Sequence, residues 1–273
     1  MNLEKMFHEL KDKGEGAHMP HVYFGDPQEE FSLKLIQTLT ENGADILEFG
    51  IPFSDPTADG PTFQAVCERA LEHGMTPSRC IEGIKKLRAK GIDNPIVVTT
   101  YYNIPYVMGV GNFLNKIKEV GAQAIIVPNV PVEEADVLLA EGKKSGIDPI
   151  FQIAPTTTED RLKKIADIAS GFLYVIGVEG VTGVRESLGD STLNLVERVR
   201  RHTDMPLLAG FGISTRKQAA AVVAAGADGA IAGSVYARVY EKSLEKPEAT
   251  LPEIAGLVGQ IKQGCIEGYR QRR

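Results

Sequence analysis

The sequence is poor in the residues that build disulfide frameworks and metal sites. Its three cysteines, Cys67, Cys80 and Cys265, are too few and too widely separated for either. The five histidines form no His-x-His or His-x-x-x-His pair, so we expect no metal centre. Tryptophan is absent, which excludes no class of function.

Long apolar runs and an excess of basic residues are also missing. No apolar segment approaches the roughly 20 residues that a membrane-spanning helix needs, and the charged N-terminal stretch MNLEKMFHELKDK shows no targeting signal. The formal net charge of -6 at pH 7 argues against a nucleic-acid-binding surface, which requires a basic stripe. We therefore expect a cytoplasmic protein that binds neither membranes nor nucleic acids.

What the sequence does contain is one repeated pattern. Hydrophobic residues make up 43% of the chain and charged residues 24%, a balance that allows a sizeable core. A helix of mixed charge that ends at glycine, a short apolar strand and a polar loop follow one another eight times. The expected strands lie within residues 18–27, 42–50, 93–103, 120–128, 145–155, 170–177, 204–212 and 225–233.

These repeats predict a closed α/β barrel. Apolar strands separated by helices are typical of parallel strands buried on both faces, and eight units in 273 residues favour a (β/α)₈ TIM barrel, with residues 1–273 as a single domain. A doubly wound open sheet is the alternative, but no strand leads into a G-x-G-x-x-G motif. Leu3, Met6, Phe7 and Leu10 form the stripe of an amphipathic helix that we expect to cap the barrel.

The stretch LEFGIPFSDPTADGP, residues 47–61, places a carboxylate inside an apolar strand. Glu48 shares a face with Ile46, while Leu47 and Phe49 lie on the other face, so either orientation of Glu48 is apolar. Burial raises the pKa of a carboxyl group, which suits a general acid or base. An ion pair with a neighbouring element is the structural alternative. Because Glu48 lies near the end of its strand, where barrel active sites are found, we favour catalysis.

The loop after this strand supplies two more carboxylates, Asp55 in an Asp-Pro turn and Asp59 in an Asp-Gly-Pro turn. Turn chemistry alone explains Asp55, because aspartate readily bonds its own backbone in tight turns. Asp59 precedes a predicted helix, and its pattern fits either a turn or a functional residue.

Two short glycine-rich turns point to a phosphate. GFGIST at residues 210–215 and AGSVYA at residues 232–237 both lead into helices, and bare backbone N–H groups at helix starts bind phosphate in barrels. Each alone fits a tight turn; together with Gly183 on the long loop 177–190 they predict a phosphate site. That loop is either a mobile lid or a surface excursion. The residues thus predict acid–base chemistry on a small phosphorylated substrate, without metal or nucleotide.

The order of these motifs resembles the α subunit family of tryptophan synthase. EFGIPFSDPTADGP followed by TFQ, then PVEEA, GVTG, GFGIS and AGS, carry the resemblance from about Met1 to about residue 265. It implies a barrel lyase that splits indole-3-glycerol phosphate into indole and glyceraldehyde 3-phosphate. It also implies no cofactor in this chain and a pyridoxal-phosphate-dependent β subunit that receives the indole, in an α₂β₂ complex.

The resemblance also implies roles for single residues. Glu48 would be the acid and base, and Asp59 would bind the indole N–H. The remaining expected substrate contacts are Tyr101 and Tyr174 in the indole-glycerol pocket, Thr182 in the GVTG motif, and Gly183, Gly212, Gly233 and Ser234 around the phosphate.

The chain departs from the family pattern in three places. His21 and Tyr23–Phe24 stand on the first strand where the family usually has an apolar and smaller residues, which predicts an altered pocket floor. Asn129 replaces a usual Asp on the side that faces the β subunit. IGVEGVTG lacks a usual Arg and adds Glu179 near the anionic ligand. A standalone indole-releasing lyase and a low-activity allosteric partner of the β subunit are therefore the alternatives.

Overall fold

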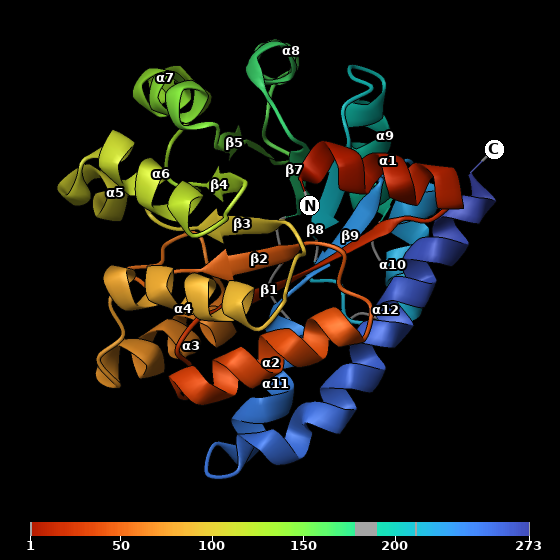
Figure 1. Ribbon diagram of the computed structural model, residues 1–273. Helices are drawn as coiled ribbons and strands as arrows, with labels where there is room; N and C mark the ends of the chain where they lie inside the picture. The colour runs from red at the N-terminus through yellow and green to blue at the C-terminus, as the bar shows by residue number, and fades with distance from the viewer. Residues whose placement is uncertain (1, 178–189, 211, 273) are drawn as a thin grey trace.

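The computed structural model describes residues 2–177, 190–210 and 212–272. Nine parallel strands form one sheet in the order β5-β4-β3-β2-β1-β9-β8-β7-β6 (Figure 1). Their bounds are β1 Ala17–Tyr23, β2 Leu47–Gly50, β3 Ile96–Thr99, β4 Ala124–Ile126, β5 Asp148–Ile150, β6 Gln152–Ile153, β7 Leu173–Ile176, β8 Leu207–Gly210 and β9 Gly229–Ala232.

The two edges of this sheet are consecutive in the chain. Only Phe151 separates β5 from β6, and its carbonyl oxygen accepts a hydrogen bond from the backbone N–H of Tyr174 on β7. The strands therefore form a nearly closed barrel, as predicted, and each of the eight expected strand regions contains a strand. The sequence missed the interruption that divides the fifth strand in two.

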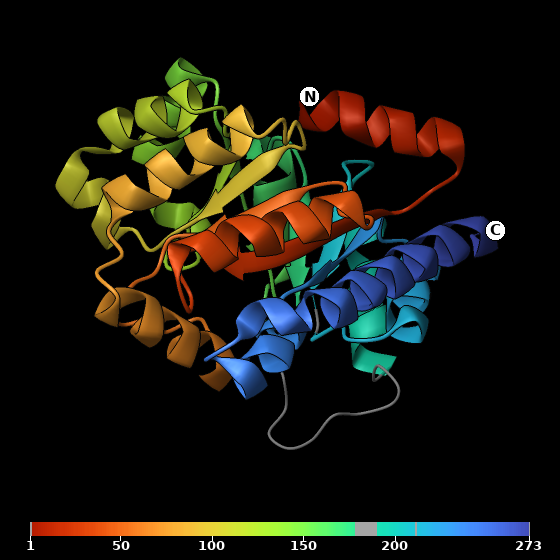
Figure 2. The ribbon, with the colours of Figure 1, turned by 60° about the horizontal axis from the view of Figure 1, so that its bottom comes forward.

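Helices surround the strands in both views (Figure 1 and Figure 2). None of the described helices is long and apolar enough to cross a membrane. The α-helices are α1 Leu3–Lys13, α2 Glu29–Glu41, α3 Pro61–Glu72, α4 Pro77–Ala89, α5 Asn103–Met108, α6 Val110–Glu119, α7 Asp136–Ser145, α8 Glu159–Ile168, α9 Asp190–Arg200, α10 Arg216–Ala224, α11 Ser234–Tyr240 and α12 Leu251–Gln271, with short 3₁₀ helices η1 Val132–Glu134, η2 Glu241–Ser243 and η3 Pro247–Thr250.

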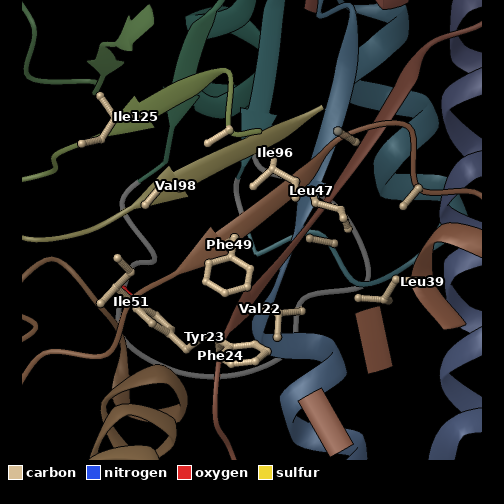
Figure 3. Packing of buried hydrophobic residues seen from close by; sticks show 14 of the residues in the cluster. Val22, Tyr23, Phe24, Leu39, Leu47, Phe49, Ile51, Ile96, Val98 and Ile125 are labelled. Atoms are coloured by element: carbon tan, nitrogen blue, oxygen red, sulfur yellow. The ribbon is translucent and has the colours of Figure 1, made fainter. Parts of the chain in front are cut away.

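Alternating side chains divide the core into two layers. Leu47 and Phe49 of β2 point outward and pack in the layer between strands and helices, where the Phe49 ring stacks on Phe24 at 4.9 Å (Figure 3). Ile46 and Met19 belong instead to the cluster inside the barrel. Because side chains alternate along a strand, Glu48 faces the barrel interior.

Helix α1 closes the N-terminal end of the barrel, as predicted. Its buried residues Leu3, Met6 and Leu10 belong to the interior cluster, and Phe7 meets Phe172 edge to face at 6.1 Å between ring centroids. With that end filled by side chains, the opposite end of the strands is left to form a site.

Helix α12 packs closely against α10, because glycine lets the two backbones approach. A Cβ atom on Gly264 would lie 2.2 Å from the carbonyl oxygen of Arg216, and one on Gly268 would lie 2.3 Å from the carbonyl oxygen of Ala220. This contact fixes the start of α10, which follows one of the glycine-rich turns.

Replacing Gly264 by alanine is expected to lower the free energy of unfolding by about 1 to 3 kcal/mol, because the added methyl group forces α10 and α12 apart. Gly256→Ala is the matched control in the same helix: a Cβ there meets nothing within 4 Å. Alanine should stabilise that position by up to about 1 kcal/mol. Denaturant unfolding of both variants measures the difference, and equal stabilities would contradict a close α10–α12 contact.

Candidate active site

A cavity of about 360 Å³ opens at the C-terminal ends of the strands. It is lined by side chains from the strands and by the loops that follow β2, β8 and β9. A larger depression of about 1310 Å³ lies beside α1, but its lining comes from the opposite end of the barrel and includes none of the predicted site residues. The smaller cavity is therefore the candidate active site.

The cavity brings together most of the residues that the sequence singled out. Tyr101 does not line the cavity, but its hydroxyl donates a hydrogen bond to Asp59, which does. Thr182 and Gly183 lie outside the described residues, as does most of the loop 177–190. The predicted residues that line the cavity are Glu48, Asp59, Tyr174, Gly212, Gly233 and Ser234.

Glu48 is buried, with only 2% of its surface exposed. The hydroxyl of Thr99, the partner residue of Gly50 in the pairing of β3 with β2, donates a hydrogen bond of 2.7 Å to Glu48 Oε1. Burial raises the pKa of Glu48 to about 8; the Thr99 hydrogen bond opposes this effect and the charge of Asp59 adds to it. Glu48 is therefore mainly uncharged at neutral pH.

The structural alternative for Glu48, an ion pair, does not hold. The nearest basic group among the described residues is His21, whose Nδ1 lies 3.4 Å from Glu48 Oε1. Burial lowers the pKa of His21 to about 3, so the imidazole is neutral near pH 7. The contact is dipolar and longer than a good hydrogen bond.

Asp59 lies in a different environment at the rim of the same cavity. Its Oδ2 accepts hydrogen bonds from the hydroxyl groups of Tyr101 at 2.6 Å and Tyr23 at 2.7 Å. Burial raises the pKa of Asp59, and the two phenol donors oppose that shift by stabilising the carboxylate. The Asp59 side chain thus makes contacts at the cavity rather than within its own turn. The side chain of the exposed Asp55, in the described contacts, accepts a hydrogen bond only from its neighbour Ser54.

Glycine makes room for the rings that line the cavity. A Cβ on Gly233 would lie 2.6 Å from the ring of Phe63, and one on Gly210 would lie 2.8 Å from the hydroxyl oxygen of Tyr174. Gly233 therefore has a packing role as well as its predicted place beside the phosphate.

In the turn before α10, two backbone N–H groups already have a hydrogen-bond acceptor within the protein. Gln218 Oε1 accepts from the backbone N–H of Ser214 at 2.9 Å and of Thr215 at 3.2 Å, which completes a capping box. A phosphate at this end of the cavity would meet the turn at Gly212, whose positive φ of 65° suits glycine.

Several lining residues are absent from the sequence prediction. Thr99 lies on the same face of β3 as the interior residue Val97, so strand alternation could have found it. Phe63, Gln152 and Arg238 had no such signal, because the fold alone places them at the cavity. No cluster of three or more His, Cys, Asp or Glu side chains in the described part of the chain could hold a metal ion.

The comparisons with known proteins agree with this geometry. The family model described as Tryptophan synthase alpha chain matches residues 7–265. The tryptophan synthase alpha chain of Methanocaldococcus jannaschii is 46% identical over 90% of this chain and 87% of its own length, and that of Methanopyrus kandleri is 42% identical over 99% and 97%.

Two solved structures have the same fold as this chain. The crystal structure of the tryptophan synthase alpha chain from Legionella pneumophila superposes with a TM-score of 0.87 at 28% identity, over 97% of each chain. The structure of Mycobacterium tuberculosis tryptophan synthase reaches the same TM-score of 0.87 at 31% identity, over 96% of this chain and 97% of that chain. This chain belongs to the tryptophan synthase alpha chain family.

Proposed function

We propose that this chain cleaves indole-3-glycerol phosphate to indole and glyceraldehyde 3-phosphate, as the lyase component of tryptophan synthase. The observation that carries the proposal is the meeting of Glu48 and Asp59 in one cavity with the turns that follow β8 and β9. Family membership supports the same activity in the last steps of tryptophan biosynthesis. The comparisons give no support to a standalone lyase or a low-activity allosteric partner.

The two carboxyl groups suit different steps of a retro-aldol cleavage. The uncharged Glu48 gives its proton to C3 of the indole, which places positive charge on the ring nitrogen. Asp59 accepts a hydrogen bond from the indole N–H and stabilises that charge. Both phenols donate to Asp59 Oδ2, so among the described contacts Oδ1 is left to face the substrate.

Cleavage then returns the proton to Glu48. As the bond between indole C3 and the glycerol chain breaks, the hydroxyl on the adjacent carbon becomes the aldehyde of glyceraldehyde 3-phosphate. Its proton passes to the Glu48 carboxylate, which restores the starting form of the enzyme. One carboxyl group thus serves as acid and then as base, and this role requires a pKa near the working pH.

The far end of the cavity suits the phosphate. We assign the ester to Gly212, Gly233 and Ser234, together with Thr182 and Gly183 from the GVTG motif. Arg238 is the only positively charged side chain among the described residues that line the cavity. It lies one helical turn after Ser234 on α11, where its charge attracts the anionic group. Tyr174 lines the indole-glycerol part of the pocket, and Tyr101 acts through Asp59.

The partner surface is expected at the same end of the barrel. Tyr106 is 70% exposed and Val107 83% exposed on α5, in the connection that follows β3. Exposed apolar side chains near a site mouth suit a docked protein. Asn129 Oδ1 accepts from the backbone N–H of Tyr102 at 2.9 Å, a bond that the usual Asp could also accept, so this replacement preserves the local backbone.

The family implies a β subunit as the partner. We propose an α₂β₂ assembly in which pyridoxal phosphate is on the β subunit, while residues 1–273 act as one barrel domain without a cofactor. A cytoplasmic location fits the three cysteines, all buried and unpaired, because reducing compartments keep thiols free.

Glu48→Gln is expected to lower kcat by about 10²- to 10⁴-fold, because glutamine cannot carry the proton.

For the native protein, activity should fall as pH rises through about 8, where Glu48 loses its proton. The proton is bound more tightly in the folded state, so native stability should decline between about pH 4.5 and pH 8 relative to the variant. Indole release and urea unfolding across pH measure both effects; near-normal turnover of the variant would remove Glu48 from the mechanism.

Asp59→Asn is expected to lower kcat by about 10²-fold to 10³-fold, because the neutral amide stabilises the developing positive charge poorly. The matched control is Asp55→Asn, which makes the same charge change on the same loop and should keep native turnover. Steady-state indole formation distinguishes the two variants. An equal loss of activity in both variants would show that the loop's overall charge, rather than Asp59, matters, and native turnover of Asp59→Asn would remove Asp59 from the mechanism.

Arg238→Met is expected to raise KM for the phosphate ester roughly fivefold, as loss of about 1 kcal/mol of attraction would predict, with a smaller change in kcat. Arg216→Met is the control, because Arg216 is exposed and paired with Glu267 away from the cavity. The difference between the variants should shrink at high salt. An unchanged KM for Arg238→Met would place the phosphate elsewhere.

A further inference from the structure

Two buried polar atoms of the cavity have no hydrogen-bond partner among the described residues. They are His21 Nε2 and Glu48 Oε2. Two other buried side-chain atoms, Thr100 Oγ1 and Arg198 Nε, also lack a partner, but neither residue lines the cavity. Buried polar groups are normally paired, since leaving them unpaired costs free energy. Two such unpaired atoms at the candidate active site therefore indicate that the bound ligand supplies their hydrogen-bond partners.

The fold holds these two side chains next to each other. His21 on β1 and Glu48 on β2 are direct partners in the parallel pairing of the two strands. The His21 ring belongs to a cluster of three aromatic rings, with its centroid 4.9 Å from that of Tyr23 and 4.6 Å from that of Phe63, while Tyr23 and Phe63 lie 5.2 Å apart. Strand pairing and these ring contacts thus hold the imidazole beside Glu48.

The contacts also indicate which imidazole nitrogen carries the proton. Neutral histidine carries one N–H donor and one acceptor nitrogen. Glu48 Oε1 accepts from Thr99 and lies 3.4 Å from His21 Nδ1, so we place the proton on Nδ1, where it faces an acceptor. His21 Nε2 is then a hydrogen-bond acceptor adjacent to the carboxyl group that performs the proton transfer.

We propose that His21 Nε2 and Glu48 Oε2 together bind a vicinal diol, in which His21 accepts a hydrogen bond from the second hydroxyl of the glycerol chain. This inference rests on the proposed function, because that chain carries hydroxyl groups on neighbouring carbons. One hydroxyl gives its proton to Glu48 during cleavage. The other hydroxyl remains intact, and its bond to His21 orients the chain so that the correct hydroxyl faces Glu48. His21 is a substrate-binding residue in this account.

The experiment compares indole-3-glycerol phosphate with its analogue that lacks the second hydroxyl. Retro-aldol cleavage remains possible for the analogue, because the hydroxyl that becomes the aldehyde is still present. We expect native kcat/KM to be about tenfold to a hundredfold lower for the analogue, since a site built to pair a hydroxyl discriminates against its loss. Equal native kcat/KM values for the two substrates would overturn the inference, and this comparison needs only the native protein.

Variants of His21 locate the effect. His21→Phe should lower kcat/KM for the natural substrate at least about tenfold and leave the analogue almost unchanged. His21→Gln keeps an acceptor near the position of Nε2 and should restore part of the preference for the hydroxyl. A loss of the same factor for both substrates in His21→Phe would instead show a purely structural role. Thermal unfolding of each variant checks that it is folded.

Thr99→Val provides the matched control. It removes the hydrogen bond to Glu48 Oε1 but leaves His21 Nε2 in place. Its kcat/KM should fall by a similar factor for both substrates, and the pH dependence of turnover should move to higher pH because Glu48 loses a stabilising donor. His21, Tyr174 and Asp59 are the other titratable groups around Glu48. Failure of the native protein to release indole from either substrate would refute the proposed function instead.

Discussion

The site depends on the burial of one carboxyl group inside a closed barrel. Glu48 occupies a position on β2 whose face is otherwise apolar, and the cost of desolvation raises its pKa to about 8. The same cost destabilises the folded protein at neutral pH, because the unfolded chain would ionise there. The surrounding core offsets that cost, and Glu48 keeps its proton near neutral pH, as the proposed acid–base role requires.

The N-terminal end of the barrel is filled by packed side chains, and the C-terminal end carries the candidate active site. At the N-terminal end, α1 fills the opening with Leu3, Met6 and Leu10, which are buried in the interior cluster. At the other end, loops bring Asp59 and the glycine-rich turns around Glu48. Asp59 is held by Tyr23 and Tyr101 from two different strand regions, so the carboxylate at the rim is positioned by the barrel rather than by its own turn.

Much of this architecture was predictable from local sequence patterns. Apolar strands separated by glycine-capped helices predicted the barrel, and alternation along Ile46, Leu47 and Glu48 predicted a carboxyl group in an apolar environment. Side-chain partners across the barrel were not predictable, because Thr99 and His21 meet Glu48 only after β1, β2 and β3 pair. Asp59 stayed ambiguous for the same reason: its distinguishing contacts come from residues far away in sequence. The interruption at Phe151 left no local signal.

The most direct test of this account is the pKa of Glu48 in the ligand-free protein. Carbon-13 NMR of protein labelled at the glutamate carboxyl carbons, with Glu48→Gln to assign the resonance, would follow its titration. Burial of Glu48 inside the barrel predicts a midpoint near 8, far above the ordinary 4.5 of a glutamate side chain. A midpoint close to 4.5 would contradict it, because Glu48 would then be ionised at neutral pH and could not supply the first proton.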